Sequence, residues 1–138
     1  MIVQNRTEIV SVVLKAMILF TLSELAHKAL FFADTWTIAA DVFVIISRVV
    51  IFVWTSLKLS SKIDLLPFLG LVFLLSFFEY IFLGFISLMV LSLIERQFLI
   101  VHGFIGLSVT FPIVLAFVML LSGVVFMVSA KLKSKNRN

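Results

Sequence analysis

Two residues of opposite charge stand near the middle of two consecutive apolar stretches. Arg48 interrupts the stretch 36–59, and Glu79 interrupts the stretch 65–93. A charge in the hydrocarbon of a bilayer costs roughly 2.5–3.5 kcal/mol on insertion scales, so each side chain must face protein or water. Because a short polar loop joins the two stretches, we expect neighbouring antiparallel helices that bring the two charges to a similar depth. The sequence therefore predicts that Arg48 and Glu79 pair inside the membrane.

Further polar residues surround this pair. Asp41 stands seven residues before Arg48, and we expect it to be a second partner of that arginine. Ser76 stands three residues before Glu79, so it shares a helical face with the carboxylate and is expected to donate a hydrogen bond to it. Arg48 shares its own helical face with three polar residues at spacings of four and seven: Thr37, Asp41 and Thr55.

The stretch 9–32 carries a third group of ionisable residues. Glu24, His27 and Lys28 share a face at spacings of three and four residues, which predicts an ion pair between Glu24 and Lys28. Ionisable residues in membrane helices often mark a route for protons or ions. Two interpretations are therefore open: a structural network of ion pairs, which is the ordinary outcome, and an ion path that enters from the outer face. Both use the same residues: Glu24, Lys28, Asp41, Arg48 and Glu79.

Metal and cofactor sites are only weakly indicated. Glu24 and His27 form one Glu-x-x-His motif, whereas a carboxylate-bridged di-iron site needs that motif on two helices. His27 and His102 are weak candidates for metal or haem ligation, and histidines at the membrane interface are the ordinary explanation. Cysteine is absent, which excludes thiolate metal sites and a cysteine nucleophile. We expect no metal, no cofactor and no enzymatic activity, because the sequence also lacks a nucleophile–base pair and a phosphate-binding loop.

The composition places these residues in a membrane protein. Of the 138 residues 63% are hydrophobic and the mean hydropathy is +1.29, whereas soluble domains are about 45–50% apolar. Sixteen Phe against five Gly favour bulky packing and lipid contact over a glycine-lined pore. The apolar stretches predict an all-α bundle of transmembrane helices in one domain, 1–138, with a kink at Pro112 in the last helix. The four helices are expected at about 9–32, 36–59, 65–93 and 103–130.

The basic residues predict the orientation of this bundle. Of the eleven basic residues, Lys28 and Arg96 fall on one side of the predicted membrane, Arg48 lies within it, and the other eight fall on the opposite side. The positive-inside rule then places both termini in the cytoplasm. This pattern explains the net charge of +4 without a nucleic-acid partner. The eight basic residues on the cytoplasmic side are Arg6, Lys15, Lys58, Lys62, Lys131, Lys133, Lys135 and Arg137.

Small residues recur along the last predicted helix. Ala116, Gly123 and Ala130 stand seven residues apart and so form a stripe. Small residues let helices approach closely in lipid, where van der Waals packing replaces the hydrophobic effect. The stripe predicts a packing face, either within the bundle or against a partner subunit.

The order of four spans, the cytoplasmic termini, the basic tail and the two opposite charges in the membrane resemble the phosphate-starvation-inducible PsiE family. That family carries a Glu in its second span and an Arg in its third, and Arg48 and Glu79 hold those positions with the signs exchanged. The resemblance covers the architecture of the whole chain and no specific residue string. It implies a membrane protein without an assigned reaction. Glu24 also resembles the carboxylate of small multidrug transporters, but the small-residue-rich first helix of that family is missing.

Together these features predict a non-catalytic integral membrane protein of a plasma membrane or bacterial inner membrane. We expect it to serve as an accessory or assembly subunit that packs against a larger membrane complex. Its partners would be lipid and either other membrane subunits or further copies of itself. The alternative is a small proton- or ion-coupled transporter or channel that uses the intramembrane carboxylates.

Overall fold

The computed structural model describes residues 2–32, 37–95 and 100–136, and every element in these ranges is a helix. The elements are α1 (Ile2–Phe32), α2 (Thr37–Leu59), α3 (Leu65–Ser76), η1 (Phe77–Leu83), α4 (Gly84–Glu95) and α5 (Ile100–Lys135). The segments α3, η1 and α4 follow one another without a break and form one helical rod. Within this rod η1 is a π-helix, in which the backbone hydrogen bonds span five residues instead of four.

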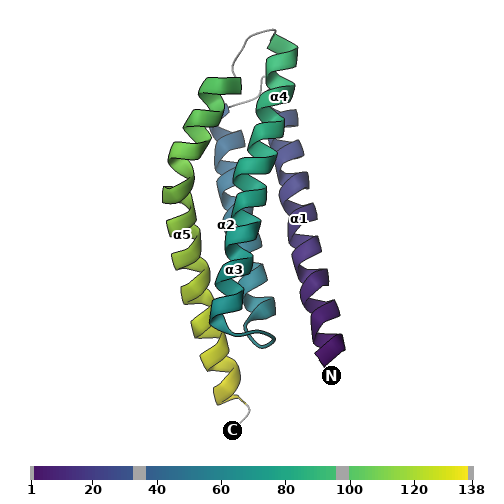
Figure 1. Ribbon diagram of the computed structural model, residues 1–138, viewed down its shortest axis with the longest axis vertical. Helices are drawn as coiled ribbons and strands as arrows, with labels where there is room; N and C mark the ends of the chain where they lie inside the picture. Colours follow the sequence, from purple (N-terminus) through teal and green to yellow (C-terminus); the bar gives the residue numbers. More distant parts are fainter. Residues whose placement is uncertain (1, 33–36, 96–99, 137–138) are drawn as a thin grey trace.

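Four helical rods in these ranges are long and apolar enough to cross a membrane. This confirms the predicted all-α architecture with four candidate spans. The helices extend beyond the predicted stretches, since α1 begins at Ile2 rather than residue 9 and α5 passes both ends of 103–130. Hydropathy marks the length that matches a bilayer, whereas a helix can continue into water on its own backbone hydrogen bonds. α5 also continues through Pro112, and Figure 1 shows this helix curved along its length.

In the bundle α2 and the α3–η1–α4 rod stand at opposite corners. α2 packs against α1 and α5, and α3 packs against α5 and α1. Figure 1 shows the same arrangement, with α1 and α5 on either side, α3 in front and α2 behind. The expectation that α2 and α3 pack as direct neighbours is therefore wrong. The turn 60–64 that joins them carries the chain across the end of the bundle, and α1 and α5 occupy the other two corners.

Both ends of the chain lie at one end of the bundle (Figure 1). We call the half of the bundle at this end the terminal half, and the opposite half the distal half. The terminal half comprises α1 up to Phe20, α2 from Ile51, all of α3, and α5 from Val118. The distal half comprises the remainder of these helices together with η1 and α4.

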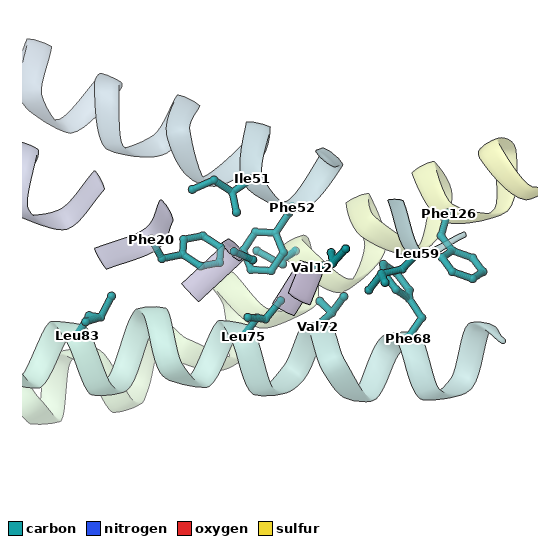
Figure 2. Packing of buried hydrophobic residues seen from close by; sticks show 12 residues of the cluster. Val12, Phe20, Ile51, Phe52, Leu59, Phe68, Val72, Leu75, Leu83 and Phe126 are labelled. Carbon is teal, nitrogen blue, oxygen red and sulfur yellow. The ribbon is translucent and has the colours of Figure 1, made fainter. Parts of the chain in front are cut away.

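Apolar side chains fill the terminal half. Phe20 of α1 and Phe52 of α2 lie with ring centroids 5.0 Å apart, and Phe68 of α3 stacks on Phe126 of α5 at 4.4 Å. All four rings are buried, and Figure 2 shows them among the aliphatic side chains of the same cluster. In a bilayer such a core stabilises the bundle through close van der Waals contact between helices.

A polar contact closes the terminal half at the end of α2. The hydroxyl oxygens of Ser60 and Ser129 are 2.9 Å apart and form a buried hydrogen bond. Lys133 donates to the carbonyl oxygen of Leu57 at 2.8 Å and to the Ser60 hydroxyl at 3.0 Å. The last carbonyl groups of a helix lack an intrahelical partner, and a lysine can satisfy them. α5 thereby fixes the C-terminal end of α2.

Candidate functional site

The centre of the site is the ion pair between Arg48 and Glu79. The Arg48 Nε atom of α2 contacts the Glu79 Oε1 atom of η1. Glu79 is only 5% exposed, whereas Arg48 is 30% exposed. The two residues therefore meet as their matched depth predicted. They do so across the centre of the bundle, because the long arginine side chain spans the gap between two helices at opposite corners.

A second carboxylate, Glu24 of α1, completes the environment of Arg48. The Arg48 Nη2 atom lies 3.7 Å from Glu24 Oε2, and the Lys28 Nζ atom lies 3.7 Å from Glu24 Oε1. The expectation that Asp41 is the second partner of Arg48 is wrong. Asp41 and Arg48 share a helical face, but seven residues along one helix separate them by about 10.5 Å, beyond the reach of an ion pair. Glu24 reaches Arg48 because it comes from the neighbouring helix.

Asp41 instead meets a histidine from α1. Its Oδ1 atom lies 3.1 Å from the Nε2 atom of His27. Asp41 is 70% exposed, so this contact is at the surface of the bundle. The other ring nitrogen of His27, Nδ1, is buried and lies 4.0 Å from Glu24 Oε1. His27 thus stands between the surface carboxylate and the buried network.

The serine that donates to a carboxylate of the network is not the one that the sequence predicted. The Ser76 hydroxyl donates to the Val72 carbonyl at 2.7 Å, so the expected hydrogen bond from Ser76 to Glu79 is wrong. Serine in a helix commonly donates back to the carbonyl four residues earlier. Ser87 of α4, which the sequence did not single out, donates to Glu24 Oε1 at 2.9 Å. Its spacing within α4 gave no signal, because its partner lies on another helix.

A cavity of about 390 Å³ lies in the distal half beside these charges. Glu24, Lys28 and Arg48 face it from α1 and α2. Three of the five glycines of the chain also line it. The remaining lining residues come from η1, α4 and α5, and comprise Tyr80, Gly84, Ser87, Leu88, Gly103, Gly106, Leu107 and Thr110.

The three glycines serve this cavity in two ways. A Cβ atom on Gly84 would lie 3.0 Å from Leu107 Cδ1, and one on Gly103 would lie 2.6 Å from Leu88 Cδ2. Glycine at these two positions therefore lets leucines of the facing helix pack against the backbone, which holds α4 close to α5. A Cβ atom on Gly106 would meet no atom within 4 Å. Gly106 leaves open space on the cavity wall.

The predicted stripe of α5 is not one uniformly packed face. Ala116 is exposed, Gly123 is buried and Ala130 is half-buried. A straight helix rotates by about 20° for every seven residues, so residues at this spacing drift around it. Gly123 lies where α5 meets α3, since a Cβ atom there would be 3.8 Å from Leu69 Cδ2.

The histidines and acidic residues do not assemble a metal site in the described part of the chain. No group of three or more His, Asp or Glu side chains there is close enough to hold a metal ion. His102 falls in the first turn of α5, and its side chain lies outside the described residues, as does that of Thr37.

Comparison of the chain with protein-family models, with curated proteins and with solved structures gave no match. The resemblance to the PsiE family stays a prediction.

Proposed function

We propose that this chain is a non-catalytic integral membrane protein that acts as an accessory or assembly subunit of a larger membrane complex. The observation that carries the proposal is the closed terminal half. Phe20, Phe52 and Phe68 are no more than 2% exposed, and they fill the centre of the bundle below the charge network. A path for protons or ions needs polar groups or water along its whole length, because an ion in a dry apolar core loses its hydration without compensation. In the described part of the terminal half the buried polar side chains are hydroxyls, and those of Thr55, Ser56 and Ser76 donate to backbone carbonyls of their own helices, so they offer an ion little compensation.

The balance of charges also supports a structural role for the network. Two cations, Arg48 and Lys28, face two carboxylates, Glu79 and Glu24. Each buried charge therefore has an opposite charge nearby, which lowers the cost of keeping it inside the membrane. A network whose charges balance fixes the relative positions of α1, α2 and η1, as an assembly subunit requires.

We further propose that both termini face the cytoplasm. The placement of both termini at one end of the bundle is compatible with the excess of basic residues near that end. Reporter fusions at Lys62 and after Asn138 should both read cytoplasmic, and a fusion near Arg96 should read external. If Lys62 and Asn138 read from opposite sides, the four-span topology is wrong.

Two measurements test the accessory role. Purification of the tagged chain in mild detergent should recover a membrane partner in fixed stoichiometry, and deletion of the chain should lower the amount of that partner. Vesicles that contain the purified chain should show no proton or cation flux above empty vesicles. Recovery of the chain as a single species without a partner, together with flux, would contradict the proposal.

A second candidate is a small proton- or ion-coupled carrier, and one feature favours it. The π-helix η1 carries Glu79 directly at the charge network. Single π-turns inside α-helices occur frequently at functional sites and can permit a change of helical register. Flux that is lost in Glu79→Gln would select this candidate over the accessory role.

A further inference from the structure

The hydrogen-bond donors that face the cavity belong to two cations. A lysine ammonium carries three N–H donors and an arginine guanidinium carries five. Lys28 Nζ and Arg48 Nη2 each lie 3.7 Å from a Glu24 oxygen, which is beyond the length of a hydrogen bond. Each of these two side chains is 30% exposed. The Nε donor of Arg48 is taken up by Glu79, whereas the 3.7 Å contacts with Glu24 leave donors of Lys28 and Arg48 available to a ligand.

The hydroxyl groups that line the cavity already donate hydrogen bonds within the protein. The Thr110 hydroxyl donates to the Gly106 carbonyl at 2.8 Å, so the hydrogen bond between Tyr80 and Thr110 takes its proton from Tyr80. The Ser87 hydroxyl donates to Glu24. A ligand in the cavity would find its available donors on Lys28 and Arg48, and it would have to bring acceptors.

The volume and the walls limit the size of this ligand. A volume of 390 Å³ is many times the ~10–15 Å³ that one water molecule needs on the same measure, so a carboxylate or phosphate with a small organic body fits. Leu88, Leu107 and Gly106 add apolar surface to the lining of the cavity. Oxyanions bind preferentially to arginine and lysine donors because charge-assisted hydrogen bonds are about twice as strong as neutral ones.

We propose that this cavity binds a small organic oxyanion, with a carboxylate or phosphate group held between Lys28 and Arg48 and an apolar portion against Leu88, Leu107 and the open backbone at Gly106. The oxyanion has two possible sources, a water-soluble molecule or the headgroup of an anionic lipid. Both present the same chemistry to the two cations. The site is independent of the accessory role proposed above, since a subunit can carry it with or without a partner.

Thermal unfolding of the purified full chain in detergent tests the site. The probes are sodium benzoate, inorganic phosphate and a short-chain phosphatidic acid, with sodium chloride at equal ionic strength and short-chain phosphatidylcholine as references. A ligand that binds the folded state raises the melting temperature in proportion to its occupancy. We expect at least one oxyanion to raise the melting temperature by several degrees above its reference. A shift with phosphatidic acid alone would assign the site to a lipid headgroup, and a shift with benzoate or phosphate would assign it to a soluble molecule.

Two variants and their matched controls locate the binding. Gly106→Leu places a side chain in the open space of the cavity wall and should abolish the shift, whereas Gly70→Leu, where a Cβ atom also meets nothing within 4 Å, lies outside the cavity and should retain it. Lys28→Met should raise the oxyanion concentration for half the shift by about tenfold or more, because a charged hydrogen bond is lost. Lys15→Met, an exposed position on the same helix in the terminal half, should not. Gly106→Ala and Lys28→Gln replace the first two variants if either fails to fold.

Three results would overturn the proposal. The first is a melting temperature that no oxyanion raises above its reference, in which case the cavity simply holds water. The second is a shift that persists unchanged in the Gly106 variants. The third is a Lys28 variant that responds like Lys15→Met, because the lysine would then not contact the oxyanion.

Discussion

The terminal and distal halves of the bundle use the same four rods in opposite ways. In the terminal half, rings such as Phe68 and Phe126 fill the space between helices, and the polar contact at its end involves hydroxyls and one lysine. In the distal half, charged side chains from α1, α2 and η1 meet beside a cavity. The difference shows that one bundle can separate close packing, which holds the helices together, from a polar region, which could hold a ligand.

The two halves also differ in how easily they tolerate change. An apolar core loses contacts when a side chain is shortened, but it leaves no charge exposed to hydrocarbon. A charge network loses much more stability from a single substitution, because the partner of the removed charge is left buried and unpaired. Substitutions in the charge network should therefore cost more stability than substitutions in the apolar core.

The largest effect is expected in the distal half, at Arg48 and Glu79. Arg48→Ala should lower the free energy of unfolding by about 3–5 kcal/mol, because it leaves Glu79 buried without its main partner. Glu79→Ala should be of similar size, and Glu79→Gln should be milder because the amide oxygen can still accept a hydrogen bond from the guanidinium. Thermal unfolding in detergent and the steady-state amount in the membrane measure these changes.

A charge reversal sharpens this prediction. Arg48→Glu combined with Glu79→Arg restores an opposite pair, but it also places the new carboxylate beside Glu24, which lies 3.7 Å from the Arg48 guanidinium. We therefore expect the double reversal to recover only part of the lost stability, and the further change Glu24→Gln to recover more. If the double reversal is no better than the worse single variant and Glu24→Gln adds nothing, the pair does not stabilise the bundle.

A smaller effect is expected in the terminal half, at Leu75. Leu75 is 2% exposed, and Leu75→Ala should lower the free energy of unfolding by about 2–5 kcal/mol through loss of contacts and formation of a cavity. The adjacent Leu74 is 62% exposed and provides a matched control for which Leu74→Ala should change stability by about 0.5 kcal/mol or less. Equal effects at the two positions would mean that α3 packs with another face than the one described.

The smallest effect is expected at the edge of the network, at Asp41. Asp41→Asn removes the charge that contacts His27, yet the side chain is 70% exposed. An ion pair at such a position contributes about 0.2–1 kcal/mol. The melting temperature should therefore move by far less than in Arg48→Ala. A loss comparable to that of the arginine variant would place Asp41 inside the network rather than at its edge.

Much of the helical architecture could be predicted from the sequence, and less of the site. The apolar stretches marked four spans because hydropathy over about 20 residues is a local property of the chain. The contact of Arg48 with Glu79 agreed with their matched depth, although the expectation that their helices pack as direct neighbours was wrong. The contacts of Glu24 with Arg48 and Ser87 could not be predicted, because they depend on which helices pack side by side. For the same reason the sequence predicted Asp41, rather than Glu24, as the second carboxylate beside Arg48.

The sequence by itself determined that the chain is helical, that it is apolar enough for a bilayer, and that Arg48 and Glu79 lie at a similar depth. Composition and the order of residues along each helix decide these properties. The tertiary structure alone decided that α2 and α3 stand at opposite corners, that a π-helix carries Glu79, and that Gly84, Gly103 and Gly106 line one cavity. The physical reason is that an apolar helix has several faces suitable for packing, and only the simultaneous fit of all four rods selects among them.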